Sequence, residues 1–328
     1  MTRLKRTTAD PARHPRVAVV TDLDGCLLDH RTYRAGPARR VLRRLRRLGV
    51  PVVLCTSKTR AELRALRREL GGPYLAIVED GAGIFVPAGI APTLRLQAAR
   101  RVRDGRLVRL APGYARVRRV FAALQRGIDG AAVGFGDMTV ADVATATGLS
   151  TVAARLARRR EFDEPFVFAS DERRHARVLT RRAARHGLVV THGGRFWHLH
   201  GRSDKGRAMR LARELLQRAH GALFIIALGD SPLDAPMLRE ADLPIIVPRP
   251  DGSADPALRR RLPRARVAPA PGPAGWAKAV TRAVRELHHS PGRKTAREFP
   301  AMRRRRRRAP GIARRGPARP ARRRSPAP

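Results

Sequence analysis

The chain has 328 residues, enough to bury a large core and to form about two domains. Its formal net charge of +43 would ordinarily indicate a nucleic acid or an anionic surface as partner. Here nearly all of the positive charge is arginine, with only five lysines, and alanine, proline and glycine are also abundant, which indicates a genome-wide composition bias. Because the arginines spread along every predicted helix, composition argues against nucleic-acid binding as the main function.

The cellular location is predicted from what the sequence lacks. Cys26 and Cys55 are the only cysteines, too few for the disulfide framework of a small secreted protein, so we expect reduced thiols. No run of 18 apolar residues occurs, and residues 1–16 contain no apolar stretch that would serve as a signal peptide. These features predict a cytoplasmic protein without a membrane-spanning segment.

The first part of the chain alternates between strands and helices. Residues 1–15 are polar and predict a loose tail. Over residues 16–86, short apolar runs alternate with segments whose apolar residues recur at helical spacing. This alternation is typical of an α/β fold with a parallel sheet and right-handed crossovers. The predicted strands are Val17–Val20, Pro51–Cys55, Leu75–Val78 and a hairpin-like Ile84–Val86, and the predicted helices are Pro37–Leu48 and Arg60–Leu70.

Residues 87–199 have a different pattern, which we interpret as an inserted α+β domain. A hairpin is expected around the turn Asp104-Gly105, and a helix is expected to begin after Ser150 as its N-cap. The remaining predicted elements are helices at Val117–Leu124, Val140–Ala146, Thr151–Arg159 and Arg173–His186, and strands at Phe166–Ala169 and Leu188–Thr191.

The α/β pattern resumes over residues 200–289 and completes the first domain. The apolar run Ala222–Leu228 predicts a strand buried on both faces. Residues 290–328 are rich in arginine and proline and include six consecutive arginines, which predicts a disordered tail. The other predicted elements are helices at Lys205–Arg218, Ala235–Glu240 and Trp276–Leu287 and a strand at Leu243–Val247.

Polar residues follow three of the predicted parallel strands, and the carboxyl ends of such strands form the edge where open α/β sheets bind ligands. Carboxylates that lie close together at one sheet edge repel one another unless they share a cation. A ligand set made of oxygens favours Mg²⁺ as that cation. Lys205 would supply positive charge for a phosphoryl group. For each aspartate alone, the simpler explanation is a residue at a strand end that caps the next helix. This explanation does not account for all of these polar residues occurring together. The residues are Asp22, Asp24, Thr56, Ser57, Asp230 and Asp234.

These residues resemble the motifs of the haloacid dehalogenase (HAD) superfamily of phosphotransferases. The order of the motifs and the long insertion between the second and the third also match, which implies a Rossmann-like HAD core with an inserted type II (IIB) α+β cap. The motifs are Asp22-Leu23-Asp24-Gly25, Thr56, Lys205 in Ser203-Asp204-Lys205-Gly206, and Gly229-Asp230 with Asp234.

The resemblance implies a role for each motif residue. Asp22 would be the nucleophile that becomes an aspartyl-phosphate, and Asp24 would protonate the leaving oxygen and then activate the hydrolytic water. Thr56 and Lys205 would hold the phosphoryl oxygens. Mg²⁺ would bind the carboxylates of Asp22 and Asp230 and the backbone carbonyl of Asp24. Attack on a phosphate dianion requires its repulsion to be screened, which a metal and a lysine can do.

Longer stretches are similar to the mannosyl-3-phosphoglycerate phosphatase family, over about residues 17–287. The similarity implies removal of the 3-phosphate from a glycosylated glycerate, which yields the compatible solute mannosylglycerate. Ser57 and Lys58 are candidates for the phosphate or carboxylate, and Glu164 for sugar hydroxyls, although a solvated lysine and a strand-capping glutamate fit equally well. The stretches are Thr21–Tyr33, Val52–Glu62, Gly134–Val140, Glu161–Phe166 and Gly194–Gly206.

Some positions depart from the family or lie outside its motifs. Leu233 and Asp80 stand where the family usually has asparagine, which would affect substrate preference or cation geometry. Asp234 is expected to orient Lys205 or a metal-bound water rather than to bind the metal. His198 and His200 would share one face of a strand, as a polar linker rather than a metal site, since a third soft ligand is lacking.

Four alternatives stay open at this stage. The catalytic motifs fit the glucosyl analogue or another sugar phosphate equally well, and capped HAD enzymes include phosphomutases. A non-enzymatic receiver domain also combines aspartate, threonine or serine, lysine and Mg²⁺, but its phosphorylated aspartate follows an internal strand. The arginine-rich tail would bind RNA, DNA or an acidic surface in a salt-sensitive way if it has a function.

Overall fold

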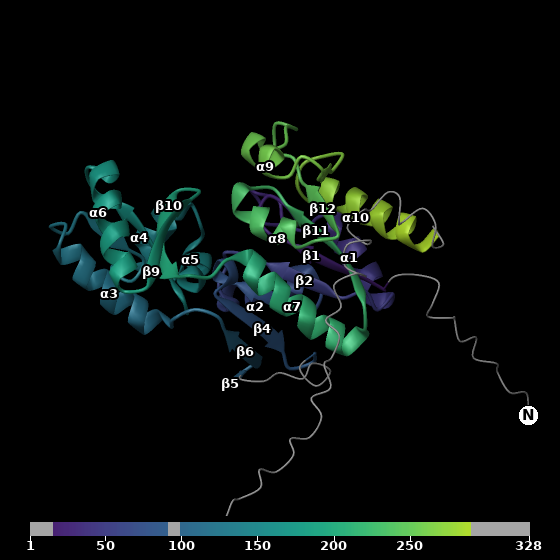
Figure 1. The fold of residues 1–328 in the computed structure, drawn as a ribbon, viewed down its shortest axis with the longest axis horizontal. Helices are drawn as coiled ribbons and strands as arrows, with labels where there is room; N and C mark the ends of the chain where they lie inside the picture. Colours follow the sequence, from purple (N-terminus) through teal and green to yellow (C-terminus); the bar gives the residue numbers. More distant parts are fainter. Residues whose placement is uncertain (1–15, 91–98, 290–328) are drawn as a thin grey trace, which may run out of the picture.

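The computed structural model describes residues 16–90 and 99–289, which form two β-sheets surrounded by helices (Figure 1). The larger sheet has the order β13-β12-β11-β1-β2-β3-β4-β6-β5 and the smaller one β7-β8-β10-β9. The tails predicted at residues 1–15 and 290–328 lie outside the described residues. The strands of the larger sheet are β1 (Arg16–Thr21), β2 (Val52–Cys55), β3 (Leu75–Val78), β4 (Gly83–Pro87), β5 (Arg100–Val102), β6 (Gly105–Arg109), β11 (Leu223–Gly229), β12 (Leu243–Ile246) and β13 (Arg266–Val267).

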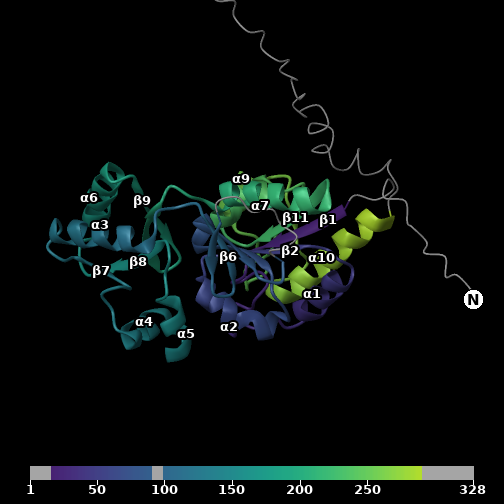
Figure 2. The same cartoon turned by 90° about the horizontal axis from the view of Figure 1, so that it is seen from below.

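The centre of the larger sheet is parallel and buried on both faces, as the apolar runs predict. Along β1, Val17 and Val19 pack on one face, whereas Ala18 and Val20 pack on the other. The core is therefore divided into two layers by the sheet, with helices outside each layer (Figure 2). Helices α1 (Ala38–Arg47), α2 (Arg60–Leu70) and α10 (Gly272–His289) cover one face, and α7 (Lys205–His220), α8 (Ala235–Arg239) and α9 (Pro256–Arg261) cover the other.

Two helix starts next to the strand ends are fixed by local hydrogen bonds. Thr59 caps α2 in a capping box, in which its hydroxyl accepts from the Glu62 backbone and the Glu62 carboxylate accepts from the Thr59 backbone. Asp204 caps α7, since its carboxylate accepts from the backbone N–H groups of Gly206 and Arg207. The second cap places Lys205 at the first position of a helix, beside the sheet edge where the predicted site residues lie.

The predicted hairpin exists, but it pairs with the larger sheet. Strand β6 runs antiparallel to β4, with Gly83 opposite Arg109 and Pro87 opposite Gly105, and β5 pairs with β6. Residues 100–109 therefore extend the larger sheet, although the sequence pattern assigned them to the insertion that begins at residue 87. The sequence pattern of a hairpin predicts only the pairing of its own two strands. It does not predict which other strand the hairpin will pair with.

The smaller sheet and its helices form what we call the small unit, residues 114–201. One face of its sheet is covered by α3 and α6, with Phe121, Phe166 and Leu199 in the shared core. Ser150 caps α5, as the sequence predicts. The elements are α3 (Tyr114–Arg126), β7 (Ala132–Gly134), α4 (Val140–Thr147), α5 (Thr151–Ala157), β8 (Asp163–Phe168), α6 (Glu172–Arg185), β9 (Leu188–Gly193) and β10 (Phe196–Gly201).

Two further expectations concern cysteines and membranes. Cys26 and Cys55 are both buried free thiols. No helix within residues 16–90 and 99–289 combines the length and the hydrophobicity that a membrane span requires.

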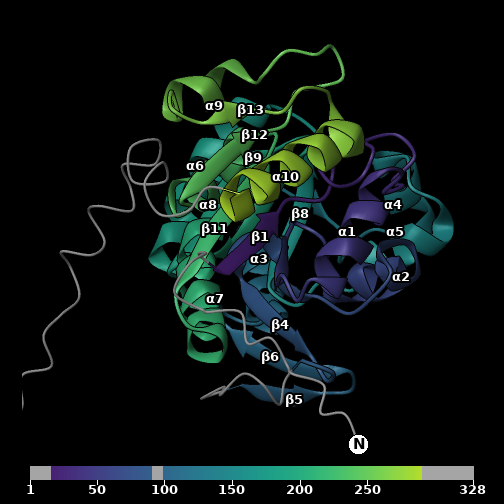
Figure 3. The ribbon, with the colours of Figure 1, turned by 90° about the vertical axis from the view of Figure 1, so that its right-hand side faces the viewer.

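Helix α10 supports the end of β1 directly. It lies beside α1 and over β11 (Figure 3). Its Trp276 is fully buried, and the indole Nε1 donates a hydrogen bond of 2.8 Å to the Thr21 hydroxyl, one residue before Asp22. The bond links the last helix of the chain to the strand end that carries the first predicted catalytic residue.

We expect Trp276→Ala to lower the free energy of unfolding by about 3–5 kcal/mol, because it leaves a large cavity and removes the partner of Thr21. The measurement is urea denaturation followed by circular dichroism. Val152→Ala is the control, since Val152 is 68% exposed and its truncation should change stability by no more than about 0.5 kcal/mol. Equal effects of the two substitutions would contradict this account of the core.

Candidate active site

Lys205 joins two aspartates that come from different strand ends. Its Nζ lies 2.7 Å from Asp22 Oδ1 and 2.7 Å from Asp234 Oδ1. Asp22 directly follows β1, and Asp234 ends the 3₁₀ turn Pro232–Asp234 that follows β11. All three side chains are nearly inaccessible to solvent. The structure thus brings together three of the predicted site residues in one buried ion cluster.

Both carboxylate oxygens of Asp234 are engaged within the protein. Oδ1 accepts from Lys205, while Oδ2 accepts from the backbone N–H groups of Asp230 and Ser231 and from the Ser231 hydroxyl, at 3.1–3.2 Å. A carboxylate with both oxygens occupied has little capacity left for a metal. The geometry therefore favours Asp234 as a residue that holds Lys205 in place.

The cluster carries more negative than positive charge. One ligand oxygen from each of Asp22, Asp230 and Asp234 lies within 4.8 Å of the others, and Lys205 is the only cation in contact with them among the described residues. Burial raises the pKa of Asp230 to about 7, and the negative charge of Asp234 adds to the shift. Burial also raises the pKa of Asp22, although Lys205 opposes the shift. A divalent cation would offset this excess charge, so the donor set fits one.

Asp22 and Asp230 are the members of the cluster with oxygens to spare. Lys205 engages only Oδ1 of Asp22, and no donor within the described ranges reaches its Oδ2. Asp230 approaches the turn after β1 closely, since a Cβ at Gly25 would lie 2.7 Å from Asp230 Oδ2. Gly25 also has φ +76°, a backbone conformation that favours glycine. The turn can therefore hold the two carboxylates together only without a side chain at residue 25.

Asp24 lies on the accessible side of the cluster. Its side chain is 37% exposed, and Oδ2 is 2.9 Å from Lys58 Nζ. Lys58 also lies 3.8 Å from Glu62 and above the ring of Tyr33. Burial lowers the pKa of Lys58, but Asp24 and Glu62 raise it by more. The lysine is therefore a buried, paired cation that holds Asp24, and its predicted contact with substrate stays a prediction.

Thr56 and Ser57 follow β2 at the same edge of the sheet. The hydroxyl of the buried Thr56 accepts from the Lys58 backbone at 3.1 Å, which leaves its hydrogen available for a substrate oxygen. The carbonyl of Ser57 accepts from Arg160 Nη1 of the small unit at 3.2 Å. This segment thus contacts both the catalytic edge and the small unit.

Glu79 is a connecting residue that sequence reasoning missed. Its buried carboxylate accepts from three consecutive backbone N–H groups of the small unit, in residues 161–163, at 2.9–3.0 Å. Arg160 lies 3.6 Å away. Burial raises the pKa of Glu79 to about 7. Glu79 and Asp80 also have φ of 46° and 54°, which is strained for residues with a side chain. A glutamate after a strand looks like an ordinary turn residue, so the sequence offers no signal for this contact.

Glu164 and Asp163 point to opposite faces of β8, as neighbours in a strand must. Glu164 is fully buried and turns toward α3, where it pairs with Arg118 and accepts from the Gly136 backbone. Asp163 lies on the other face and binds His198, with Nδ1 2.8 Å from Oδ2. The structure therefore places Glu164 inside the small unit and its neighbour next to Glu79 of the core. The predicted role of Glu164 toward sugar hydroxyls stays a prediction.

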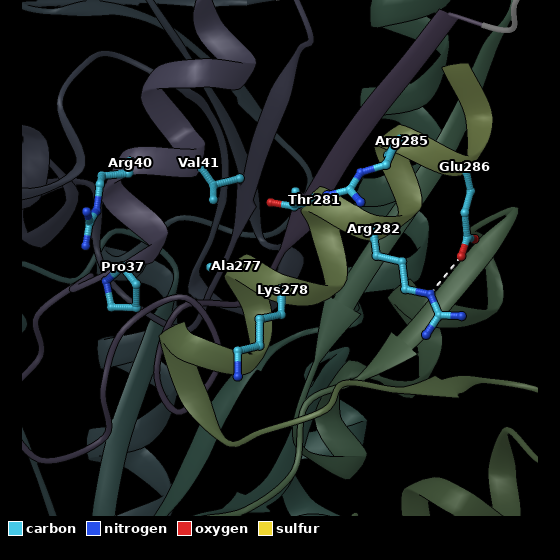
Figure 4. Close-up of a pocket in the computed structure, with 9 residues that line it drawn as sticks. All are labelled: Pro37, Arg40, Val41, Ala277, Lys278, Thr281, Arg282, Arg285 and Glu286. Carbon is cyan, nitrogen blue, oxygen red and sulfur yellow. Dashed lines mark hydrogen bonds and ion pairs between the residues drawn. The ribbon is translucent and has the colours of Figure 1, made fainter. Parts of the chain in front are cut away.

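The site lies where the small unit meets the larger sheet. Arg60 of α2 pairs with Glu161 at 3.0 Å. Leu233, beside Asp234, lies against Gly193 of the β9–β10 turn, since a Cβ there would lie 2.9 Å from Leu233 Cδ1. A surface groove between α1 and α10 (Figure 4) shares none of these residues, so it is separate from the site.

The chain is similar to known phosphatases. No family model matches the chain. It is 37% identical over 262 residues to a glucosyl-3-phosphoglycerate/mannosyl-3-phosphoglycerate phosphatase of Methanococcoides burtonii, covering 80% of this chain and 95% of that protein. It is 34% identical over 274 residues to a protein of the same name from Persephonella marina, covering 83% of this chain and 98% of that protein.

Solved structures share the fold. A HAD phosphatase from Bacteroides thetaiotaomicron superposes with a TM-score of 0.58 at 18% identity, covering 86% of this chain and 99% of that one. A HAD subclass IIB sugar phosphatase superposes with a TM-score of 0.56 at 14% identity, covering 82% and 99%. The predicted fold class, a Rossmann-like α/β core with an inserted α+β unit, is confirmed.

We expect Gly25→Ala to lower kcat/KM by about 10- to 100-fold, because the new Cβ displaces the Asp230 carboxylate. Gly49→Ala is a matched control, since Gly49 also has positive φ but nothing within 4 Å of its Cβ position. It should cost about 1–2 kcal/mol of stability and leave kcat/KM unchanged. Phosphate release and thermal unfolding measure the two quantities. If both variants lost the same activity, backbone strain rather than the carboxylate would be responsible.

Proposed function

This chain belongs to the glucosyl-3-phosphoglycerate/mannosyl-3-phosphoglycerate phosphatase family, whose members are phosphoric monoester hydrolases, and we propose that it hydrolyses mannosyl-3-phosphoglycerate to mannosylglycerate and phosphate. The observation that carries the proposal is the 37% identity over 95% of a relative with that name. Glucosyl-3-phosphoglycerate is the alternative substrate, because the same name includes it. We also propose that the enzyme acts in the cytoplasm, with which its free cysteines are consistent.

The first step of the proposed mechanism is attack by Asp22 on phosphorus. A bond forms between an Asp22 oxygen and phosphorus while the ester P–O bond breaks, and the leaving oxygen takes a proton from Asp24. Lys205, 2.7 Å from Asp22, and the hydroxyl of Thr56 stabilise the charge on the phosphoryl oxygens.

The second step hydrolyses the aspartyl-phosphate. Asp24 accepts a proton from water, the water oxygen bonds to phosphorus, and the bond to Asp22 breaks to release phosphate. Asp24 suits both steps because its side chain is 37% exposed, while Lys58 holds it at 2.9 Å. One residue can then act as acid and as base in turn.

We further propose that Mg²⁺ is held by the carboxylates of Asp22 and Asp230 and by the backbone carbonyl of Asp24. The ion would offset the repulsion between the nucleophile and the phosphate. Excess negative charge in the cluster and the spare oxygens of Asp22 and Asp230 support this assignment. Ser57 and Lys58 are proposed to lie near the phosphate or carboxylate of the substrate.

Phosphate release from a set of esters tests the function. The set comprises mannosyl- and glucosyl-3-phosphoglycerate, 3-phosphoglycerate, mannose 6-phosphate and p-nitrophenyl phosphate. We expect the highest kcat/KM with the mannosyl compound, loss of activity in EDTA and recovery with Mg²⁺. No release from either glycosylated substrate in the presence of Mg²⁺ would refute the proposal.

The nucleophile is tested by Asp22→Asn, which keeps the shape of the side chain but removes its charge. Turnover should fall by about 10³-fold or more, while the circular dichroism spectrum stays that of the wild type. Asp251→Asn is the control, because Asp251 is an exposed loop aspartate whose carboxylate bonds Ser253 in its own turn. Activity of Asp22→Asn near that of the control would rule out the nucleophile assignment.

A further inference from the structure

His198 is held in a fixed orientation on the face of the small unit that meets the larger sheet. Its ring Nδ1 lies 2.8 Å from Asp163 Oδ2. Asp163 in turn accepts from Arg160 at 2.5 Å, and Arg160 donates to the Ser57 carbonyl. A chain of contacts therefore runs from the β2 end of the core to this ring, and it leaves the ring little freedom to rotate.

The second ring nitrogen of His198 is free. Nε2 has no hydrogen-bond partner within residues 16–90 and 99–289. It is also not one of the buried, unpaired polar side-chain atoms of these residues, so it is accessible to solvent. The side chain is 18% exposed. A nitrogen that is open while its ring is fixed is suited to binding a ligand.

The ring lies on the side of the small unit whose residues contact the core, since its partner Asp163 also binds Glu79. Its neighbour Leu199 packs under α3 and α6, so the alternation along β10 turns His198 to the opposite face. Burial lowers the pKa of His198, but its contact with Asp163 raises it by more. Glu79, which directly precedes Asp80, accepts from the Asp163 backbone N–H at 3.0 Å. Asp80 Oδ1 is 3.6 Å from Lys205 Nζ, so the segment that binds Asp163 also reaches the lysine beside Asp22.

His200, two residues further along β10, is different. Its Nε2 bonds the Thr191 hydroxyl at 3.0 Å, and its Nδ1 bonds the Gly201 carbonyl at 2.8 Å. Both nitrogens are engaged, so His200 has no ring nitrogen left for a ligand, in contrast to His198.

The chemistry around Nε2 selects the ligand. With Nδ1 donating to Asp163, Nε2 accepts a hydrogen bond in the neutral ring and donates one in the charged ring. A hydroxyl group can be the partner in either state. A carboxylate fits only the charged ring and would meet the negative charge of Asp163. A neutral hydroxyl is therefore the favoured ligand.

We propose that His198 is a specificity-determining residue whose Nε2 binds a sugar hydroxyl of the substrate while the phosphoryl group lies at Asp22. This assignment rests on the proposed function, because only the glycosyl part of that substrate carries free hydroxyls. It deepens that function by naming a residue of the small unit that recognises the sugar.

Two substitutions separate the two ring nitrogens. In His198→Asn the amide nitrogen can replace Nδ1 and keep the bond to Asp163, whereas in His198→Gln it can replace Nε2. We measure the ratio of kcat/KM for the glycosylated substrate to kcat/KM for p-nitrophenyl phosphate, which has no hydroxyl. The ratio should fall about tenfold in His198→Asn, mainly through KM, and by less than about threefold in His198→Gln. His200→Asn should leave the ratio unchanged.

The outcomes distinguish this inference from the proposed function. A ratio that stays constant in His198→Asn, or that falls more in His198→Gln, would mean that the Asp163 bond rather than Nε2 matters, and would overturn the inference. If the wild type hydrolyses neither glycosylated substrate, the proposed function fails instead. The ratio of mannose 6-phosphate to p-nitrophenyl phosphate then tests His198 against another hydroxyl-bearing ester, with the same expected order of variants.

Discussion

The buried contact of Lys205 with Asp22 and Asp234 is the interaction on which the rest of the site depends. Three carboxylates gather at the ends of β1 and β11, and removing them from water is costly unless cations accompany them. One lysine meets part of that cost, and its own burial is offset by the aspartates on either side. Because Lys205 begins α7, the capping bonds of Asp204 that fix the start of this helix also fix the position of the charge.

A second layer of contacts keeps these groups in position. The backbone amides of Asp230 and Ser231 hold Asp234, the indole of Trp276 holds Thr21, and the absence of a side chain at Gly25 leaves room for Asp230. Each of these partners comes from a different segment of the chain. The site is therefore rigid because several elements meet at one sheet edge, and no single element determines it.

How much of the structure the sequence could predict depends on how far apart in the chain the interacting residues lie. The apolar run of β11, the capped start of α7 and the aspartates after β1 are local patterns, and the structure confirms the elements and brings the motif residues together. Two features depend on long-range packing and were not predictable. The hairpin of β5 and β6 joins the larger sheet through pairing with β4, and the facing of Asp163 and Glu164 depends on which side of β8 α3 covers.

The predicted site has an excess of negative charge, whereas the chain as a whole is strongly positive. Although the sequence carries +43 overall, acidic groups outnumber basic ones around Lys205, and the small unit adds Asp163 beside His198. An anionic substrate can enter such a place only where cations are concentrated, at Lys205 and at the proposed metal. The small unit instead offers hydrogen-bonding groups around acidic residues, which suit a neutral polyol. The core would therefore bind the phosphate and the small unit the sugar.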